Sequence, residues 1–264
     1  MAIVGTGRMG RALTLLLAGR GIPVLAAAGR APQAAAGSSH VLIAVADDAL
    51  PAVAARLAAA GLRGAIVLHT SGAAGPAGLK ALGEAGNATG VLHPLQTVPS
   101  PEAGVQSLPG SAFAYAGEAA AAEWALELIA ALGGQPLAID PARWALYHAA
   151  AVMACNYHAT LVDCAFELMQ GAGAGRDEAG RALAPLMRAT TENLLKLGPA
   201  DALTGPIRRG DVSTIRAHMA ALQSAPAETL RLYSAAGLRT LALAGLPSET
   251  AEMMADALRL PTQS

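Results

Sequence analysis

Aromatic and charged residues are scarce in this chain. Only 3% of its 264 residues are aromatic and 14% are charged, and the formal net charge is −1. This balance provides no basic surface for a nucleic-acid backbone and no polybasic patch for an anionic membrane. We therefore expect neither nucleic acid nor a membrane among its partners.

Cysteine is equally scarce, and long apolar runs are missing. The two cysteines, Cys155 and Cys164, fall in one predicted helix at a spacing that does not match a metal site, and so small a number suits a reducing compartment. We expect both in the core and no bound metal. Nothing resembles a membrane span of about 18 apolar residues or a secretory signal peptide, so we expect a cytoplasmic protein.

Glycine, by contrast, is concentrated at the start of the chain. A short apolar run over residues 1–4 meets GTGRMG, and a helical pattern follows. This is G-x-G-x-x-G between a strand and a helix, which is typical of a turn that binds a dinucleotide. The first glycine allows the turn, the second leaves room for a pyrophosphate, and the third lets the helix pack closely on the strand. The helix N-terminus then offers N–H groups to the phosphates. The cofactor-binding residues expected here are Gly5, Thr6, Gly7, Arg8, Met9 and Gly10. The alternative is a glycine-rich turn without a ligand.

The end of the next predicted strand, residues 22–29, bears on the choice of cofactor. An NAD enzyme usually places a carboxylate there to bind the ribose 2′-OH. This chain has Arg30 instead, whose guanidinium can pair with a 2′-phosphate, so the sequence favours NADP. The alternative is a solvated surface arginine. Only nine residues, 31–39, precede the next strand, too few for a full crossover. We expect most of one strand–helix unit to be missing and the adenine side to be open.

The following segment, HVLIAVADDALPAVAARLAAAG, predicts a buried strand, a turn and a helix. Ala46, in the turn, is assigned to the cofactor site. Asp47 or Asp48 is expected to cap the helix, since a carboxylate at that position accepts hydrogen bonds from free N–H groups.

Two later strands end in polar residues. One ends at His69, Thr70 and Ser71, and the other at His93, followed by Gln96 and Thr97. Ligands of open parallel sheets bind beyond the carboxyl ends of the strands. We therefore predict that Ser71 and His93 line the nicotinamide and substrate side. The serine does not lie in G-x-S-x-G, which disfavours a hydrolase. Residues 111–117 and 134–140 are expected to form further short strands.

The sequence pattern changes from strands and helices to helices alone at Asp140, where a predicted helix of about thirty residues begins. His148 and Asn156 lie eight residues apart on it, so they share one face. A His and an Asn on an apolar helix are costly to bury unless paired or functional. We predict that both are functional, the alternative for His148 being a satisfied core histidine. Tyr147 and His158 are expected to be structural.

One segment, ALTGPIRRGD over residues 202–211, interrupts the helical half. Its glycines and proline are expected to form a tight loop, with Asp211 capping the next helix, and Pro226 and Pro247 starting two more. Paired arginines can bind a carboxylate through two parallel hydrogen bonds. The substrate-binding residues expected here are Thr204, Arg208 and Arg209. The alternative is a helix–helix linker with solvated arginines.

Taken in order, VGTGRMG, VLIAVADDA, HTSGA, HPLQT, YHAAAVMACNY and LTGPIRRGD resemble a bacterial family of NADP-dependent oxidoreductases. Its members join a Rossmann-like domain to a helical C-terminal domain of unknown function. The glycine motif also resembles the wider superfamily of 6-phosphogluconate, pyrroline-5-carboxylate and ketopantoate enzymes. The resemblance spans nearly the whole chain and implies an α/β Rossmann-like parallel-sheet domain (residues 1–139), followed by an all-helical domain (residues 140–264) that mediates homodimerisation. The short segment 31–39 and the abrupt start are departures.

The residues and the resemblance together predict a reductase acting on a carbonyl or imine next to a carboxylate. In this hypothesis NADPH supplies hydride, His148 supplies the proton, and Asn156 orients the substrate or stabilises the oxyanion. A 2-oxo acid such as ketopantoate is the first substrate to consider, by analogy with the superfamily. Two alternatives stay open. One is a non-catalytic NADP-binding sensor or partner module, and the other is a reductase linked to a deazaflavin.

Overall fold

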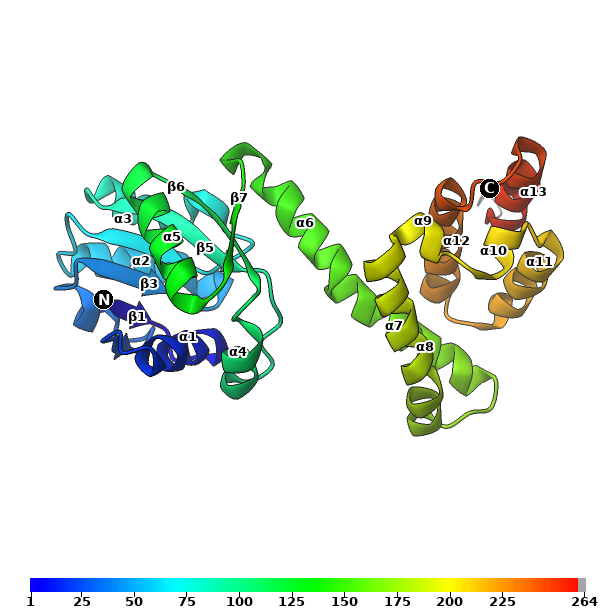
Figure 1. The fold of residues 1–264 in the computed structure, drawn as a ribbon, viewed down its shortest axis with the longest axis horizontal. Helices are drawn as coiled ribbons and strands as arrows, with labels where there is room; N and C mark the ends of the chain where they lie inside the picture. The colour runs from blue at the N-terminus through cyan, green and yellow to red at the C-terminus, as the bar shows by residue number, and fades with distance from the viewer. Residues whose placement is uncertain (261–264) are drawn as a thin grey trace. The chain divides into compact units, whose positions relative to one another are not determined.

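The computed structural model describes residues 1–260 and divides into two compact units, residues 1–156 and residues 157–264. The first unit is a seven-stranded sheet with helices on its faces, and the described part of the second is helical (Figure 1). The predicted fold class is therefore confirmed. The boundary falls after Asn156 rather than after residue 139. The reason is that Trp144 and Tyr147, on the first helix beyond the sheet, pack against the sheet.

The strands of unit 1 follow the order β2-β1-β3-β4-β5-β6-β7 across the sheet. All neighbours are parallel except β5 and β6, which run antiparallel. The strand bounds are β1 Ala2–Val4, β2 Leu25–Ala27, β3 His40–Ile43, β4 Ile66–His69, β5 Ala88–Pro94, β6 Ala112–Gly117 and β7 Gln135–Ala138. Each predicted strand is present, but β2 and β3 are shorter than their apolar runs.

The helices of unit 1 alternate with these strands. They are α1 Arg8–Gly19, η1 Pro32–Ala35, η2 Asp47–Ala49, α2 Leu50–Ala59, η3 Gly75–Leu79, α3 Lys80–Glu84, α4 Pro101–Ser107, α5 Ala119–Leu132, η4 Pro141–Arg143 and α6 Trp144–Ala154. Asp140 accepts a hydrogen bond from the N–H of Ala142, as a cap should. The expected cap at Asp47 or Asp48 is wrong. A 3-10 turn precedes α2, so both carboxylates lie inside that turn and neither forms a capping bond.

The core of unit 1 has two main layers because successive side chains of a strand point to opposite faces. Ile3 faces one cluster, with the buried side chains of α1 and α5, while Ala2 and Val4 face the other, with those of α2 and α3. A smaller third cluster joins β5 and β6 to Trp144. The short segment after β2 forms η1 in place of a helix, as its length predicted.

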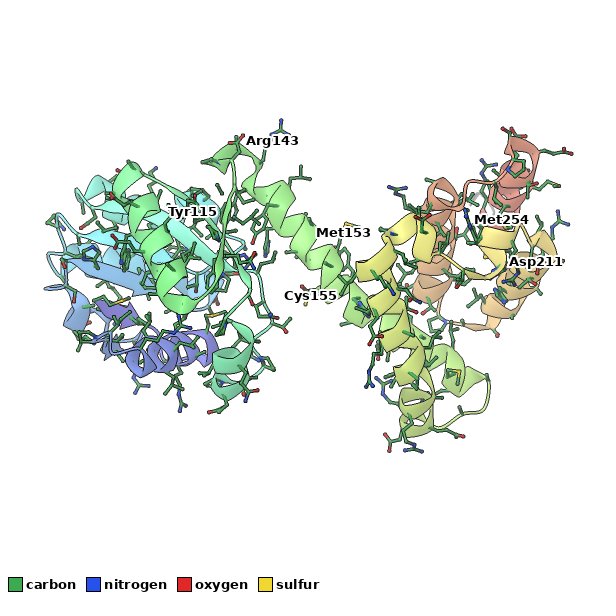
Figure 2. The ribbon with its side chains drawn as sticks, in the orientation of Figure 1. Tyr115, Arg143, Met153, Cys155, Asp211 and Met254 are labelled. Atoms are coloured by element: carbon green, nitrogen blue, oxygen red, sulfur yellow. The ribbon has the colours of Figure 1, made fainter. Side chains whose placement is uncertain are left out.

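The long predicted helix is interrupted at Cys155, which ends α6, and α7 (Asn156–Gly171) follows at once. The backbone of Cys155 has φ −114° and ψ −67°, away from helical values. Neither glycine nor proline marks the position. The physical reason is local: residues 155–158 are Cys, Asn, Tyr and His, four weak helix formers in succession. Figure 2 labels Cys155 at the end of α6.

Unit 2 continues with helices whose bounds are α8 Arg176–Leu197, α9 Pro199–Ala202, α10 Gly205–Arg209, α11 Val212–Ala221, η5 Leu222–Ser224, α12 Ala227–Ala244 and α13 Ser248–Leu258. Asp211 caps α11 through the N–H of Thr214, and Pro226 and Pro247 precede α12 and α13, all as predicted. Within residues 1–260, no helix combines the length and apolar character needed to cross a membrane.

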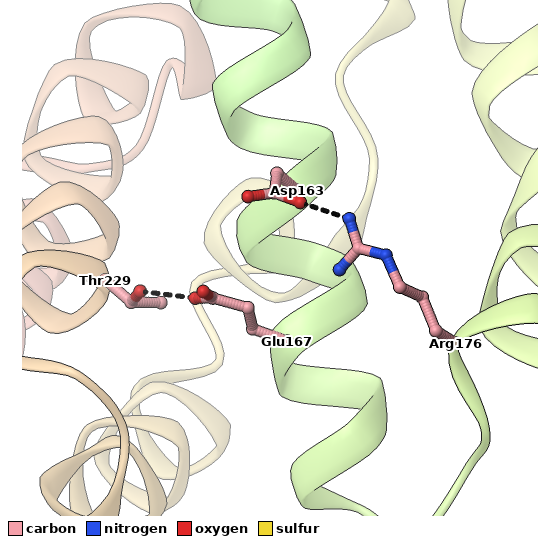
Figure 3. Close-up of polar contacts among 4 residues, drawn as sticks. All are labelled: Asp163, Glu167, Arg176 and Thr229. Atoms are coloured by element: carbon pink, nitrogen blue, oxygen red, sulfur yellow. Dashed lines mark hydrogen bonds and ion pairs between the residues drawn. The ribbon is translucent and has the colours of Figure 1, made fainter.

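The core of unit 2 is built by α11, α12 and α13, around Ile215, Met219, Met254 and Leu258. The helix α7 is attached by polar contacts instead. Figure 3 shows them: Thr229 of α12 donates to Glu167 at 3.2 Å, and Arg176, the first residue of α8, pairs with Asp163 at 2.6 Å.

The prediction of a tight loop for ALTGPIRRGD is wrong, because the centre of this segment forms the short helix α10. Gly205 and Gly210 bound this helix with φ values of +89° and +68°, which favour glycine. Arg208 donates to the carbonyl of Ala244, the last residue of α12. The segment therefore fixes the end of a neighbouring helix.

Close packing of α1 on the sheet gives a testable prediction. A Cβ added at Gly10 would lie 2.1 Å from the carbonyl oxygen of Gly5, whereas nothing lies within 4 Å of one added at Gly7. We expect Gly10→Ala to lower the free energy of unfolding by roughly 1–3 kcal/mol and Gly7→Ala by less than about 1 kcal/mol. Urea denaturation measures both, and equal losses would contradict the packing described.

Candidate functional site

The first candidate site is a cavity of about 490 Å³ at the carboxyl ends of β1 and β3. Its lining combines the glycine motif with residues that follow the neighbouring strands: Gly5, Thr6, Gly7, Arg8, Met9, Gly29, Ala44, Val45, Ala46, Thr70 and Val98. Of the predicted cofactor residues, Gly10 lies behind the cavity, against Gly5. Arg30 directly follows the lining residue Gly29, and its exposed side chain lies outside the lining.

The glycines of the motif have the geometry that a dinucleotide requires. Gly5 has φ +130°, and a Cβ there would lie 2.0 Å from the carbonyl oxygen of Ala44. The backbones of β1, β3 and α1 thus meet where no side chain fits. Gly7 borders open space instead, in the position where a pyrophosphate approaches a Rossmann turn.

The N-terminus of α1 is electrostatically prepared for an anion. No side chain caps it, no acidic residue stands in its first turn, and its first residue is Arg8. The helix dipole places partial positive charge at this end, where a cation is unfavourable. An arginine there fits a site that binds negative charge. The residues present therefore fit a pyrophosphate.

The turn after β4 is fixed by His69. This imidazole is fully buried: its Nδ1 accepts from the N–H of Ser71 at 3.1 Å, and its Nε2 lies 2.8 Å from the carbonyl oxygen of Gly75. Accepting at Nδ1 leaves the proton on Nε2, which donates to Gly75. Burial lowers the pKa of His69 to about 4, so it is neutral at pH 7. Ser71 is itself buried and accepts from Ala74, which gives it a role in the turn.

A second cavity, of about 470 Å³, lies between the end of β5 and α6. Its lining includes the predicted residues His93, His148 and Asn156, together with Tyr147 and the apolar side chains of α6. The full lining is His93, Pro94, Leu95, Gln96, Thr97, Leu137, Tyr147, His148, Ala150, Ala151, Val152, Ala154, Cys155 and Asn156. Apart from its two imidazoles, no basic or acidic side chain lines it.

Three rings meet at the mouth of this cavity. Nδ1 of His93 lies 2.7 Å from the hydroxyl oxygen of Tyr147, and the rings of His93 and His148 have centroids 5.8 Å apart. Both imidazoles pack closely against Gly72. A Cβ added at Gly72 would lie 2.8 Å from His93 Nε2 and 2.7 Å from His148 Cδ2. The indole of Trp144 donates to the carbonyl oxygen of Gly72 at 2.7 Å.

Burial sets the electrostatics of this group. Burial first, and then the proximity of His148, lowers the pKa of His93 to about 4. Burial raises the pKa of Tyr147 to about 12. Both groups are therefore neutral at pH 7.

The two cavities adjoin through one short turn. Thr70 lines the first cavity, and Gly72, two residues later, touches both imidazoles of the second. Two residues span at most about 7 Å. Val98 and Thr97 are likewise neighbours that line one cavity each.

The sequence did not predict that Tyr147 and Trp144 lie beside His93 and Gly72. Tyr147, expected to be structural, has its hydroxyl oxygen 2.7 Å from Nδ1 of His93. The signal was present in the helical spacing, since Trp144, Tyr147, His148 and Ala151 follow i, i+3, i+4, i+7 and share a face. What the sequence could not show was that His93 lies opposite that face.

The predicted substrate residues of unit 2 lie around α10. Thr204 is its N-cap, and Arg208 and Arg209 are its last two residues. Arg208 is engaged with Ala244, while the guanidinium of Arg209 makes no hydrogen bond or salt bridge with residues 1–260. Across the same residues, no three His, Cys, Asp or Glu side chains are grouped as a metal site would need.

Family models match two parts of the chain. A Rossmann-like domain matches residues 14–94, and DUF2520, a domain of unknown function, matches residues 111–240. This confirms the resemblance drawn from the motifs. The glycine motif itself precedes the first matched range, and the DUF2520 match begins within the sheet, just before β6. No curated protein is significantly similar to this chain in sequence.

Solved structures share this two-part fold. A protein from Thermotoga maritima is 21% identical, with a TM-score of 0.71, and the match covers 95% of this chain and 98% of that one. A protein from Bacteroides fragilis, provisionally named an NADP oxidoreductase, is 22% identical with a TM-score of 0.71, covering 91% and 96%. A reductive aminase from Aspergillus terreus, in complex with NADPH and ethyl-5-oxohexanoate, is 20% identical with a TM-score of 0.64, covering 98% of both chains.

The imidazoles of His69, which is buried, and His93, which is partly buried, predict how stability depends on pH. The pKa values of His69 and His93 fall from 6.5 to about 4 on folding, so the unfolded chain binds protons in that interval that the folded chain does not. The free energy of unfolding should therefore fall as the pH is lowered from about 6.5 toward 4. Urea denaturation at pH 7, 6 and 5 measures this. His93→Gln should reduce the slope, and His158→Gln, at an exposed position, should not. Equal slopes in all three proteins would contradict a neutral His93.

Proposed function

We propose that this chain is an NADP-dependent oxidoreductase that reduces a carbonyl or imine next to a carboxylate. The observation that carries the proposal is the open space at Gly7, beside the uncapped N-terminus of α1 and Arg8. It lies in the first cavity, one short turn from two imidazoles. The solved relatives from Bacteroides fragilis and Aspergillus terreus, one named for NADP and one containing NADPH, support the choice of cofactor.

The residues that would hold the dinucleotide are Gly5, Thr6, Gly7, Arg8, Met9 and Ala46, with Arg30 at the 2′-phosphate. The reduced cofactor, when bound, supplies a hydride for an sp² carbon. The chain must then supply orientation and a proton. His148, which lines the second cavity beside His93, donates the proton to the developing oxyanion or amine. Asn156, which lines the same cavity, hydrogen-bonds the substrate.

A substrate carboxylate needs a cation, and the second cavity has none fixed in its lining. The candidate carboxylate ligands of the helical unit stay Arg209, whose guanidinium makes no hydrogen bond or salt bridge within residues 1–260, and Thr204, the N-cap of α10. Arg208 instead donates a hydrogen bond to the carbonyl of Ala244 at the end of α12. A 2-oxo acid such as ketopantoate remains the first compound to test, by analogy with the superfamily.

Cofactor binding and turnover test the proposal in sequence. Titration with NADPH, followed by cofactor fluorescence, should show binding to the wild type that weakens about tenfold or more in Gly7→Ala, since a methyl group occupies the space of the pyrophosphate. Gly19→Ala is the matched control, because it lies at the other end of α1 and an added Cβ there also meets nothing within 4 Å. Absence of binding by the wild type would refute the proposal.

Turnover is then measured as NADPH oxidation with a panel of 2-oxo acids, ketones and cyclic imines. His148→Gln should lower kcat by roughly 10²–10⁴-fold and leave NADPH affinity unchanged, since it removes the proton donor alone. NADPH binding without turnover of any compound would favour the alternative of a non-catalytic NADP-binding protein.

We also propose that the chain forms a homodimer through its helical part. No residue of α7 is buried, and Ala179 is the one buried residue of the 22-residue α8. Large apolar side chains lie exposed on these helices, among them Leu195 at 84%, Leu186 at 62% and Leu197 at 50%. Apolar helix surfaces of this extent mark an interaction site, and a second copy presents the same surface.

Disrupting that surface should separate the copies. Leu186 and Leu197 are eleven residues apart, so they share a face of α8. We expect the double variant Leu186→Asp/Leu197→Asp to elute as a monomer in light-scattering chromatography, whereas Leu15→Asp, on the half-exposed face of α1, leaves the wild-type mass unchanged. A monomeric wild type would contradict the homodimer.

A further inference from the structure

A second arginine, which the motifs did not indicate, lies next to the chain segment that leaves the first cavity at Gly29. Gly29 lines the cavity and Arg30 follows it. The guanidinium of Arg56, on α2, donates a hydrogen bond through Nη2 to the backbone carbonyl oxygen of Arg30. Arg56 is thus attached to the backbone that carries the expected 2′-phosphate ligand.

The short connection after β2 makes this contact possible. Residues 31–39 form only the 3-10 turn η1, which packs directly against α2. With no full helix in between, α2 lies next to the end of β2. Side chains on a helix point back toward its N-terminus, and α2 starts at the carboxyl end of β3. Arg56 therefore extends toward the ligand edge of the sheet.

The arginines at this edge are unpaired, in a chain that has few charges. Among residues 1–260, the guanidinium groups of Arg8 and Arg30 make no hydrogen bond or salt bridge, and Arg56 contacts only the Arg30 carbonyl. The acidic residues of the adjoining η2, Asp47 and Asp48, form no salt bridge with them. A guanidinium has five N–H donors, so Arg56 keeps donors available for a ligand.

We propose that Arg56 is a positioning and specificity-determining residue for the 2′-phosphate of NADP. It holds the backbone of Arg30 and adds a second positive charge next to it. A planar guanidinium suits a phosphate because it can donate two parallel hydrogen bonds. An unphosphorylated ribose offers no such partner, so the contribution of Arg56 is specific to the phosphorylated cofactor. The inference rests on the proposed function.

The test compares nucleotides that differ only in this phosphate. Dissociation constants are measured for NADPH and NADH by fluorescence, and for adenosine 2′,5′-bisphosphate and AMP by calorimetry. Arg56→Ala should weaken NADPH and the bisphosphate about tenfold and leave NADH and AMP within about twofold. Arg56→Lys, which retains the charge, should recover part of the loss. The matched control is Arg63→Ala. Arg63 is an exposed arginine that follows the end of α2, and it also donates to backbone carbonyls, those of Ala58 and Leu62.

The outcomes distinguish the assignment of Arg56 from the proposed function on which it rests. A selective loss for the phosphorylated nucleotides in Arg56→Ala, absent in Arg63→Ala, supports the assignment. Equal losses for NADPH and NADH, or no loss, overturn it, because a purely structural contact would not distinguish the two cofactors. Should the wild type bind neither NADPH nor NADH, the proposed function itself fails. Thermal unfolding of each variant verifies that its fold is retained.

Discussion

The hydrogen bond from the indole of Trp144 to the carbonyl of Gly72 is the contact on which the candidate site depends. It attaches α6, a helix that follows the last strand, to a turn that follows the fourth. Because α6 is held there, Tyr147 meets His93, and His148 packs against Gly72. The turn after β4 is itself held by the buried, neutral His69. An indole, an imidazole and a glycine without a side chain thus bring one face of α6 to the carboxyl edge of the sheet.

Low charge makes the remaining charges informative. The chain has 14% charged residues, yet arginines stand at the first position of α1 and after β2 without a partner among residues 1–260. At a helix N-terminus such a charge opposes the helix dipole and so does not serve folding. The imidazole cavity lacks cations and carboxylates altogether. The unit thus has one cavity lined by an arginine at a helix N-terminus and a second cavity lined by no arginine, lysine or carboxylate.

Local patterns predicted what depends on local structure. The glycine motif, the short segment 31–39 and the cap at Asp211 follow from backbone geometry within a few residues, and each is present. The predictions that were wrong concern positions where adjacent residues favour different local structures. The carboxylates of Asp47 and Asp48 were assigned to a cap because the 3-10 turn before α2 has no signature, and the break at Cys155 arises from propensities that a periodic apolar pattern conceals. The contact of Tyr147 with His93 joins positions 54 residues apart, which periodicity cannot predict.

The neutral state of His93 links this architecture to chemistry. Two imidazoles whose ring centroids lie 5.8 Å apart repel each other when both are protonated, and burial keeps His93 neutral at pH 7. The hydroxyl of Tyr147, with its pKa raised to about 12, remains protonated and can donate to Nδ1 of His93. In that arrangement Nε2 of His93 carries the hydrogen that faces Gly72 and His148. His93 thus presents a hydrogen-bond donor at a fixed position in the cavity without a buried charge.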